Sequence, residues 1–375
     1  MKTPYYLYDL RILKDTLDVA KLSCERHGIE MHYAVKANSE KRILSMISAA
    51  GFGAECVSGN EIALAVECGF APSVIMFDGC GKTDEEIRFA LRTGIRNFNV
   101  ESLEELEVIE QIAADMDCIA PVSLRINPDI DARTLKAITT GLDDNKFGIG
   151  AYCLQDAIDI LGRSPHLSFK GVQFHVGSQI LQIDTVFKEA CIKAMAMVKR
   201  FEDAGLEVET IDLGGGLGID YENPDLHPVP DFDGWLGAID RYLKRKPSQH
   251  VVVEPGRALV GQCGSLIASV LYVKHTRTKQ FLILDAGMNN LIRPALYGAY
   301  HKIENITAAG EGREALAAYD VVGPICESSD VFAESRQVRV ARRGDLVAIR
   351  SAGAYGATMS SRYNLHDIAE AVYKE

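Results

Sequence analysis

Residues 208–218 read VETIDLGGGLG and join a short strand-like run to a cluster of glycines. β-Branched side chains dominate the run, which favours a strand, and the glycines end it abruptly. Seven other runs of this kind precede residue 258, each followed by a polar loop and a stretch with helical periodicity. They are HYAVKA (32–37), AECV (54–57), SVIMF (73–77), RNFNV (96–100), PVSLR (121–125), GVQFHV (171–176) and VVVEP (251–255).

Amphipathic stretches separate these runs. The stretch 101–116 carries apolar residues at helical spacing, and the stretch 187–205 ends at a glycine, as helices commonly do. Strand and helix repeated eight times predict an α/β fold, a TIM-like (β/α)8 barrel of parallel strands. A doubly wound open sheet is the alternative. The count of eight, and the polar residues at the carboxyl ends of most strands, favour the barrel.

The pattern changes after Arg257. The segments 265–275, 281–287, 319–324 and 345–353 are rich in β-formers, and little helix lies between them. They predict a second, mostly antiparallel β domain. We expect the barrel domain over residues 10–257, and the β domain over residues 258–375 together with a strand from residues 1–9. The Pro- and Asp-rich segment 221–235 is expected to be a surface loop.

Charge and cysteine usage exclude several classes of protein. The chain carries 40 basic and 52 acidic side chains, a formal net charge of -12, so we expect neither nucleic acid nor a membrane as partner. Nine scattered cysteines without a CxxC pair indicate reduced thiols in a cytoplasmic protein, and neither a disulfide framework nor a zinc site. The first residues lack the apolar core of a signal peptide, and no apolar run is long enough to span a bilayer.

Barrel enzymes build their sites at the carboxyl ends of the strands, so the residues there are candidates. Lys36 ends the first run between apolar neighbours. Burial lowers the pKa of such an amine and suits it to form a Schiff base, although a lysine that reaches solvent is an equally open interpretation. His175 ends the sixth run. It is either a buried histidine of the core or a functional residue.

The seventh and eighth runs end in residues suited to anions. Gly214, Gly215 and Gly216 offer backbone N–H groups to a phosphate, or merely form a tight turn. A dinucleotide fingerprint starting at Gly214 fails, because position 219 is isoleucine. Glu254, Gly256 and Arg257 follow the eighth strand. Arg257 can bind an anion, or it can pair with Glu254 as a structural ion pair. In the first case Glu254 is left to pair with a protonated ring nitrogen.

A second group of candidates lies beyond the barrel. Cys326 and Glu327 place a thiol beside a carboxylate in a loop that also reads as an ordinary turn. Arg293, Tyr297 and Tyr355 are weaker signals by themselves. Taken together, the candidates fit the binding of pyridoxal 5'-phosphate. This cofactor needs a lysine, a glycine cradle, an arginine, a ring-stacking residue and a carboxylate for its ring nitrogen.

Eight motifs in order carry a family resemblance over nearly the whole chain. The sequence resembles the fold-type III, or alanine-racemase-like, pyridoxal-phosphate decarboxylases, and within them the diaminopimelate decarboxylase family. The matching stretches are 33–38 (YAVKAN), 175–179 (HVGSQ), 214–216 (GGG), 254–257 (EPGR), 285–289 (DAGMN), 293–297 (RPALY), 323–328 (GPICES) and 354–356 (AYG).

The resemblance implies a role for each candidate near the cofactor. Lys36 would carry pyridoxal phosphate, His175 would lie against the face of its ring, and Glu254 would keep the ring nitrogen protonated. Tyr355 would contact the cofactor as well. The residues expected to hold the phosphate are Ser178, Gly214, Gly215, Gly216, Gly256 and Arg257.

The resemblance also implies the reaction. The expected activity is decarboxylation of meso-2,6-diaminopimelate to L-lysine and CO2, with Cys326 as proton donor. Arg257, Arg293, Tyr297, Glu327 and Tyr355 would bind substrate, the two arginines at the distal carboxylate and Glu327 at the distal ammonium. Ornithine has no distal carboxylate for the arginines. The family arrangement implies a homodimer in which the Cys326–Glu327 loop enters the neighbouring subunit's site.

Two other functions remain open. One is a sister decarboxylase acting on carboxynorspermidine or an acyl-carrier-bound glutamyl group. The other is a non-catalytic cofactor carrier, which the joint presence of Lys36 and Cys326 disfavours. The chain also departs from the family pattern: Glu55 stands where Asp is usual, Asp78 where His is usual, and Asn60 where Gly is common.

Overall fold

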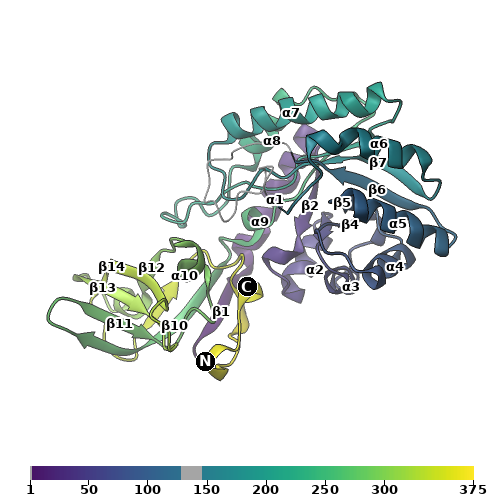
Figure 1. Ribbon diagram of the computed structural model, residues 1–375. Helices are drawn as coiled ribbons and strands as arrows, with labels where there is room; N and C mark the ends of the chain where they lie inside the picture. The colour runs from purple at the N-terminus through teal and green to yellow at the C-terminus, as the bar shows by residue number, and fades with distance from the viewer. Residues whose placement is uncertain (1, 128–145) are drawn as a thin grey trace. The chain divides into compact units, whose positions relative to one another are not determined.

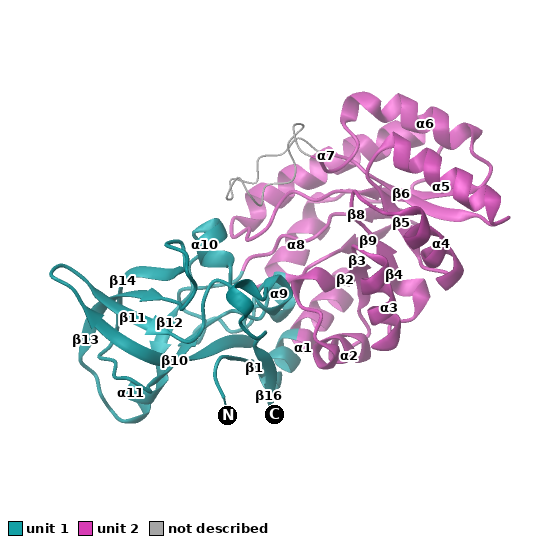
Figure 2. Ribbon diagram, turned by 60° about the horizontal axis from the view of Figure 1, so that its bottom comes forward, with its two compact units in different colours: residues 1–16, 219–230, 257–375 teal, residues 17–218, 231–256 magenta. Residues whose placement is uncertain are grey.

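The computed structural model describes residues 2–127 and 146–375. The chain divides into two compact units, which Figure 2 colours separately. Unit 1 comprises residues 1–16, 219–230 and 257–375, and unit 2 comprises residues 17–218 and 231–256. Figure 1 follows the elements of each unit along the chain.

Unit 2 contains a closed barrel of parallel strands. Each strand pairs with the next along the chain, and β2 pairs with β9 through Glu30↔Val252 and Met31↔Val253. The barrel prediction is therefore confirmed, and the open sheet is excluded. The strands are β2 (Glu30–Ala34), β3 (Gly53–Cys56), β4 (Ile75–Phe77), β5 (Asn97–Val100), β6 (Ala120–Arg125), β7 (Leu167–Gln173), β8 (Thr210–Asp212) and β9 (His250–Val253).

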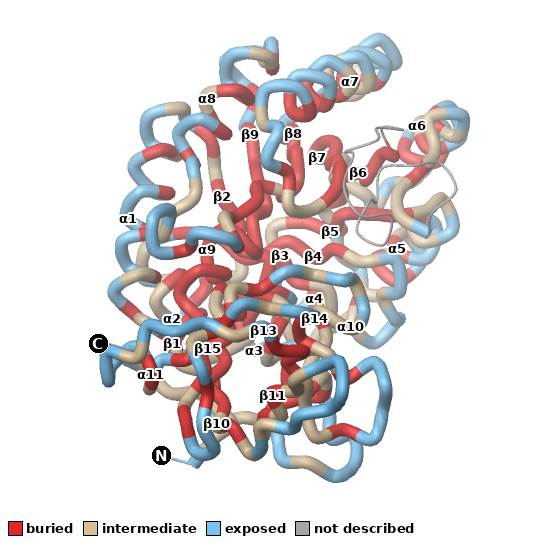
Figure 3. The backbone as a smooth tube through the Cα atoms, turned by 90° about the vertical axis from the view of Figure 1, so that its left-hand side faces the viewer, coloured by how far each residue is buried: buried red, intermediate tan, exposed pale blue. Residues whose placement is uncertain are grey.

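Burial on both faces explains why these strands lack a polar face. Every residue of β3, β4 and β5 is buried, and the barrel strands run as red segments in Figure 3. Side chains that point outward pack under helices, while those that point inward fill the barrel. The inward set includes polar groups, since Glu55, Asn97, Asn99 and Gln173 are all buried. Such groups need hydrogen-bond partners inside the barrel.

The helices begin where the sequence supplies caps. Thr83 and Glu86 form a capping box at the start of α4, and the Ser102 hydroxyl accepts the Glu105 N–H at the start of α5. The helical predictions for 101–116 and 187–205 correspond to α5 and α7. The helices are α1 (Leu10–His27), α2 (Lys41–Ala49), α3 (Gly59–Glu67), α4 (Asp84–Thr93), α5 (Leu103–Asp115), α6 (Leu154–Arg163), α7 (Ile183–Asp203) and α8 (Phe232–Tyr242).

Two boundaries differ from the sequence prediction. Strand β2 ends at Ala34, so Lys36 lies in a single 3-10 turn, Val35–Ala37, and not in the strand. Helix α8 begins at Phe232, inside the segment 221–235 whose Pro and Asp content predicts a surface loop. Asp231 caps α8 by accepting the Gly234 N–H at 2.8 Å, a local signal hidden within a run of prolines and aspartates.

Unit 1 is mostly antiparallel, as predicted. Its sheet runs β12-β15-β10-β11-β13-β14, and β1 joins it through β10; the β11–β13 and β1–β16 pairs are parallel. The strands are β1 (Tyr5–Asp9), β10 (Gly264–His275), β11 (Gln280–Leu284), β12 (Ile303–Asn305), β13 (Leu316–Val322), β14 (Val331–Arg339), β15 (Leu346–Ile349) and β16 (Glu370–Lys374), with short helices α9 (Arg257–Val260), α10 (Arg293–Tyr297) and α11 (Ile306–Gly310).

A search of the described residues found no helix with the length and apolarity needed to cross a membrane.

Close backbone approach between β7 and β8 gives a prediction about stability. A Cβ at Gly171 would lie 1.9 Å from the Thr210 carbonyl oxygen, whereas a Cβ at Gly162 in α6 would meet nothing within 4 Å. We therefore expect Gly171→Ala to lower the free energy of unfolding by about 1 to 3 kcal/mol, because the strands must separate. Gly162→Ala should raise it by roughly 0.5 to 1 kcal/mol. Urea unfolding followed by circular dichroism measures both, and equal effects would contradict the prediction.

Candidate active site

Lys36 is held by an acidic partner on the neighbouring strand. Its Nζ donates to Glu55 Oε1 at 2.7 Å and Oε2 at 2.9 Å. The Lys36 side chain is 43% exposed, while that of Glu55 is 1% exposed, so the amine is open to a ligand although its partner is buried. The departure at position 55 therefore keeps a carboxylate in contact with this lysine.

Hydrogen bonds join the loops that follow β7, β8, β9 and β2. The Ile180 N–H donates to Gly216 O at 2.8 Å, the Glu254 N–H to Gly214 O at 2.9 Å, and the Ala34 N–H to Pro255 O at 3.2 Å. The structure thus brings the predicted residues at the ends of these four strands together at one end of the barrel.

The three glycines form a cradle with no room for side chains. A Cβ at Gly215 would lie 2.4 Å from Glu254 O, and Gly214 and Gly216 have φ of +66° and +119°. Within the described residues, the N–H groups of Gly216 and Gly256 donate to no protein acceptor. Backbone donors of this kind, in a loop after a parallel strand, suit a phosphate.

His175 lies against this cradle. Its Nδ1 accepts the Gly215 N–H at 3.3 Å. Desolvation, and then the positive charges of Arg125 and Lys36, hold the pKa of His175 well below its ordinary value. A neutral, flat ring is therefore available at the end of β7, as stacking against a cofactor requires.

Glu254 lies in a buried polar network that the sequence did not reveal. Gln173 Nε2 donates to Glu254 Oε2 and to Asp78 Oδ2, both at 2.9 Å. Asn99 Nδ2 donates to Asp78 Oδ1 at 2.5 Å and to Glu254 Oε1 at 3.4 Å. Burial, and then the charge of Asp212, raise the pKa of Glu254 well above its ordinary value. A protonated nitrogen beside this buried carboxyl group would offset the cost of its negative charge.

The arginines of unit 1 form a separate cluster around one tyrosine. Arg257 Nη1 donates to the Tyr221 hydroxyl at 2.5 Å, and the guanidinium of Arg293 lies 5.0 Å from the centre of the same ring. Arg293 Nη1 donates to His301 Nε2 at 2.8 Å, and His301 Nδ1 donates to Arg350 O at 2.8 Å. Two buried guanidinium groups this close favour a bound anion.

Tyr355 belongs to the same cluster. Its ring lies 5.0 Å from the Arg257 guanidinium. Its backbone φ is +56°, which is uncommon for a tyrosine. Residues with such backbone angles are found most often at functional sites. Tyr297 ends helix α10 and contributes electrostatically to the pKa of Arg257. The predicted substrate residues on these elements are therefore assembled within one unit.

Cys326 and Glu327 lie in an exposed loop of unit 1. The Cys326 N–H donates to Asn364 Oδ1 at 2.9 Å, and the Tyr363 hydroxyl donates to the Glu327 carboxylate. Among the described contacts of unit 1, none joins this loop to Arg293. The 362–365 segment braces the thiol and the carboxylate in position.

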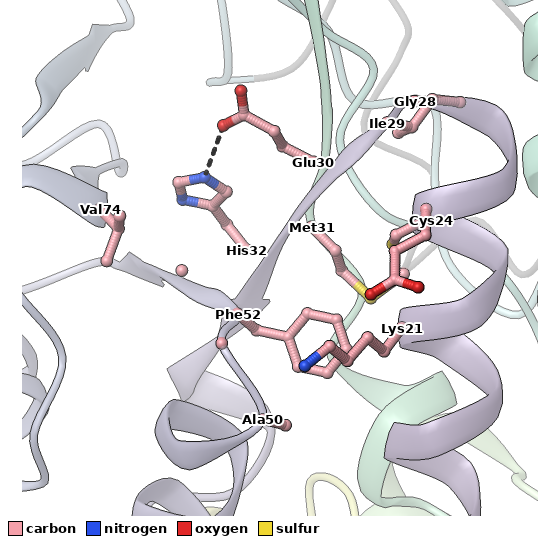
Figure 4. A pocket seen from close by; sticks show the side chains of 13 residues that line it. Lys21, Cys24, Gly28, Ile29, Glu30, Met31, His32, Ala50, Phe52 and Val74 are labelled. Atoms are coloured by element: carbon pink, nitrogen blue, oxygen red, sulfur yellow. Dashed lines mark ion pairs between the residues drawn. The ribbon is translucent and has the colours of Figure 1, made fainter.

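A hollow of about 420 Å³, drawn in Figure 4, lies at the amino ends of β2 and β3, whereas Lys36 follows the carboxyl end of β2. Its walls include Glu30 and His32, whose ion pair is drawn there, together with Phe52. The nearby His32, together with Arg96, whose Nη1 donates to Glu30 Oε2 at 2.5 Å, holds the pKa of Glu30 at about 2. In barrels of this kind the amino ends of the strands contribute to stability, and the active site lies at the carboxyl ends. In agreement, none of the predicted site residues lines this hollow.

Known proteins match the chain along its length. The family model described as "Pyridoxal-dependent decarboxylase, pyridoxal binding domain" matches residues 14–261. A diaminopimelate decarboxylase from Bacteroides thetaiotaomicron is 49% identical over 98% of this chain and 94% of its own. The chain belongs to the diaminopimelate decarboxylase family. The cofactor of this decarboxylase is pyridoxal phosphate, and the resemblance found in the sequence is confirmed.

Solved structures of the decarboxylase family agree with the fold. The crystal structure of diaminopimelate decarboxylase from Helicobacter pylori complexed with L-lysine aligns with a TM-score of 0.90 and 38% identity, covering 100% of this chain and 92% of the other. The enzyme from M. jannaschii aligns with a TM-score of 0.91 and 33% identity, covering 100% and 88%. Both units of the decarboxylase therefore have counterparts of the same fold.

The residues of unit 2 fit the cofactor of this decarboxylase. A reachable lysine, a neutral ring, a glycine cradle with unused N–H groups and a buried carboxyl group are all present. Sequence reasoning missed the residues that support them. Asn99 and Gln173 lie in strands that also hold other polar residues, such as Asn97 and Lys170, so the sequence alone does not single them out. Nothing in the sequence singled out Tyr221 or His301 as residues of a site either.

The buried imidazole of His301 gives a prediction about pH. Desolvation, and then Arg293, lower the pKa of His301 to about 3 from the ordinary 6.5. Between these values the unfolded chain binds a proton that the native state does not. The contribution of neutral His301 to the free energy of unfolding is therefore complete above pH 6.5. It falls by about 1.4 kcal/mol per pH unit as the pH drops towards the lowered pKa.

His301→Gln should flatten this dependence, because glutamine can accept from Arg293 and donate to Arg350 O without titrating. Urea unfolding at pH values from 4 to 7 measures it, with His275→Gln on the exposed end of β10 as the matched control. A slope in His301→Gln equal to that of the control would contradict the assignment.

Proposed function

We propose that the protein decarboxylates meso-2,6-diaminopimelate to L-lysine and CO2. Relatives at up to 49% identity are named diaminopimelate decarboxylase, and a neighbour in fold is described as complexed with L-lysine. The pairing of two buried arginines in unit 1 with the exposed carboxylate of Glu327 carries the choice of substrate. A distal end that bears both a carboxylate and an ammonium needs partners of both signs.

The cofactor roles in this proposal follow the geometry of unit 2. Lys36 carries pyridoxal phosphate, and His175 lies against its ring. When bound, the cofactor accepts the electron pair that departing CO2 leaves at Cα. Glu254 holds a proton at the ring nitrogen, which strengthens that acceptance. The phosphate is held by Ser178, Gly214, Gly215, Gly216, Gly256 and Arg257.

The substrate roles in this proposal fall on unit 1. Arg257 and Arg293 orient the distal carboxylate, since each guanidinium is fixed by a hydrogen bond to Tyr221 or His301. Glu327, braced by Tyr363, takes the distal ammonium. Tyr297 and Tyr355 complete the substrate contacts. Cys326 returns a proton to Cα, as an exposed thiol beside a carboxylate suits.

We further propose a homodimer in which the Cys326–Glu327 loop serves the neighbouring subunit. The loop is exposed, and so are the apolar side chains of Leu296, Tyr300 and Leu365 in the same unit. Apolar groups of this size favour burial in an interface. We place the enzyme in the cytoplasm, since all nine cysteines are free thiols.

The test of function is CO2 release from meso-diaminopimelate by the cofactor-loaded protein, beside ornithine, arginine and carboxynorspermidine. We expect release from diaminopimelate alone, with L-lysine as the second product. Release from carboxynorspermidine instead would keep the reaction and overturn the assignment of Arg293 and Glu327. No release from any of the four substrates would favour a non-catalytic carrier.

Lys36→Ala should abolish covalent attachment of the cofactor and reduce turnover by several orders of magnitude. The barrel should stay folded, because the amine contributes one partly exposed ion pair. Absorbance of the protein-linked cofactor and circular dichroism measure the two effects. Lys41→Ala, which removes an exposed ion pair with Glu67, is the matched control. Normal turnover in Lys36→Ala would end the proposal.

Cys326→Ala should slow turnover strongly and leave the cofactor bound, because only delivery of the proton to Cα is lost. Steady-state CO2 and lysine release measure this rate, and an unchanged rate would make Cys326 a packing residue. Mixing this variant with Lys36→Ala tests the dimer. Hybrid dimers would regain one intact site, about a quarter of wild-type activity in a random mixture. No recovery would place the thiol and the lysine of one site on the same chain.

A further inference from the structure

Three carboxyl groups meet inside the barrel of unit 2. Asp78 follows β4, Asp212 ends β8 and Glu254 follows β9, and their exposed fractions are 3%, 0% and 5%. The cofactor role proposed above uses Glu254 alone. The other two acids are unexplained by it, and buried carboxylates are costly unless protonated or paired.

Two amide side chains hold Asp78 and Glu254 together. Gln173 Nε2 donates to one oxygen of each acid at 2.9 Å, and Asn99 Nδ2 donates to the other oxygen of each at 2.5 and 3.4 Å. Asn97 Nδ2 donates to Asn99 Oδ1 at 2.9 Å, which fixes the orientation of that amide. Glu254 is therefore locked in one orientation by a bridge to Asp78.

Asp212 lacks one hydrogen-bond donor. Its Oδ1 accepts the Gly214 N–H at 2.8 Å, whereas its Oδ2 is fully buried and has no donor within the described part of the chain. Asp212 pairs with Val252 in the β8–β9 register, so it lies beside the segment that carries Glu254, and each carboxyl group affects the pKa of the other. Two carboxylates in contact repel one another, but a proton on one of them supplies the donor that Asp212 Oδ2 needs.

The cations that face these acids are already engaged. Lys36 donates to Glu55, which also faces the cluster, and Arg125 donates to Glu101 at 2.7 Å. His175 contributes no charge when neutral. The cluster therefore cannot carry three negative charges at neutral pH at a tolerable cost.

We propose that Asp212 and Glu254 share one proton, and that Asp78 is the positioning residue that keeps it there. Asp78 acts through the Gln173 and Asn99 bridge, which orients Glu254, and through its own nearby charge. Burial raises the pKa of Asp212 to about 7, in agreement with a proton held between Asp212 and Glu254. The catalytic meaning rests on the proposed function: the proton is stored at the carboxyl group assigned to the ring nitrogen.

The test is infrared spectroscopy of the full-length protein, with cofactor bound and with cofactor removed. A protonated buried carboxyl group gives a C=O stretch that ionised carboxylates lack. We expect that band in the wild type at pH 6, and in Asp212→Asn the loss of the part of it that the shared proton contributes. In that variant Asn Oδ1 keeps the Gly214 hydrogen bond, and Nδ2 donates to Glu254 in place of the proton. An undiminished band in Asp212→Asn would overturn the proposal.

Two further variants make the test specific. Glu254→Gln should also remove that part of the band, which covers the case in which Asp212→Asn does not fold. Asp78→Asn should leave a band that disappears at a pH lower by about one unit or more, because a neighbouring negative charge is gone. An unchanged midpoint would remove Asp78 from the proposal. Asp115→Asn, on the exposed end of α5, is the matched control and should leave the band unaltered.

Failure of this inference and failure of the proposed function are distinguishable. The part of the band that Asp212→Asn removes in the cofactor-free protein depends only on the cluster, so it persists even if diaminopimelate is not the substrate. Conversely, lysine production with no protonated carboxyl group at pH 6 would keep the function and discard the shared proton.

Discussion

The pairing of β2 with β9 is the constraint on which the rest of unit 2 depends. It closes the barrel, and the Ala34–Pro255 hydrogen bond extends it past the strand ends. Lys36 and Glu254, which are 218 positions apart in the sequence, are thereby brought to the same end of the barrel. An open sheet would leave these residues at opposite edges. The same closure encloses the polar side chains of β3, β5 and β7, and burial then forces those groups to satisfy one another.

That enclosure also sets the electrostatics of the site. Five acids and two cations share a space with little water, so their interactions are much stronger than at the surface. Glu55 forms an ion pair with Lys36, and Glu101 forms one with Arg125. The remaining acids depend on amides and on a proton. Unit 1 solves the opposite problem, since its two arginines are buried around Tyr221 with neutral partners, an arrangement suited to an anionic substrate.

Much of the fold and of the candidate site was predictable from particular residues. Eight β-rich runs, each with a polar or glycine ending, predicted the barrel, and the motifs around Lys36, Gly214–Gly216 and Glu254 predicted the cofactor. The departures at Glu55 and Asp78 were visible as departures, but their consequences were not. The 3-10 turn at Lys36 and the start of α8 at Phe232 were missed, because single-turn geometry and a cap within a proline-rich loop leave only weak local signals.

The sequence by itself determined the fold class, the cofactor and the chemically distinctive residues, since each of these depends on local patterns or on side-chain types that a reaction requires. Only the tertiary structure decided which residues act together. Asn99 and Gln173 bridge Asp78 to Glu254, and one buried oxygen of Asp212 has no donor among the described residues. These contacts link strands separated by many residues, and the distances between side chains at strand ends follow from barrel closure and register, which no single segment encodes.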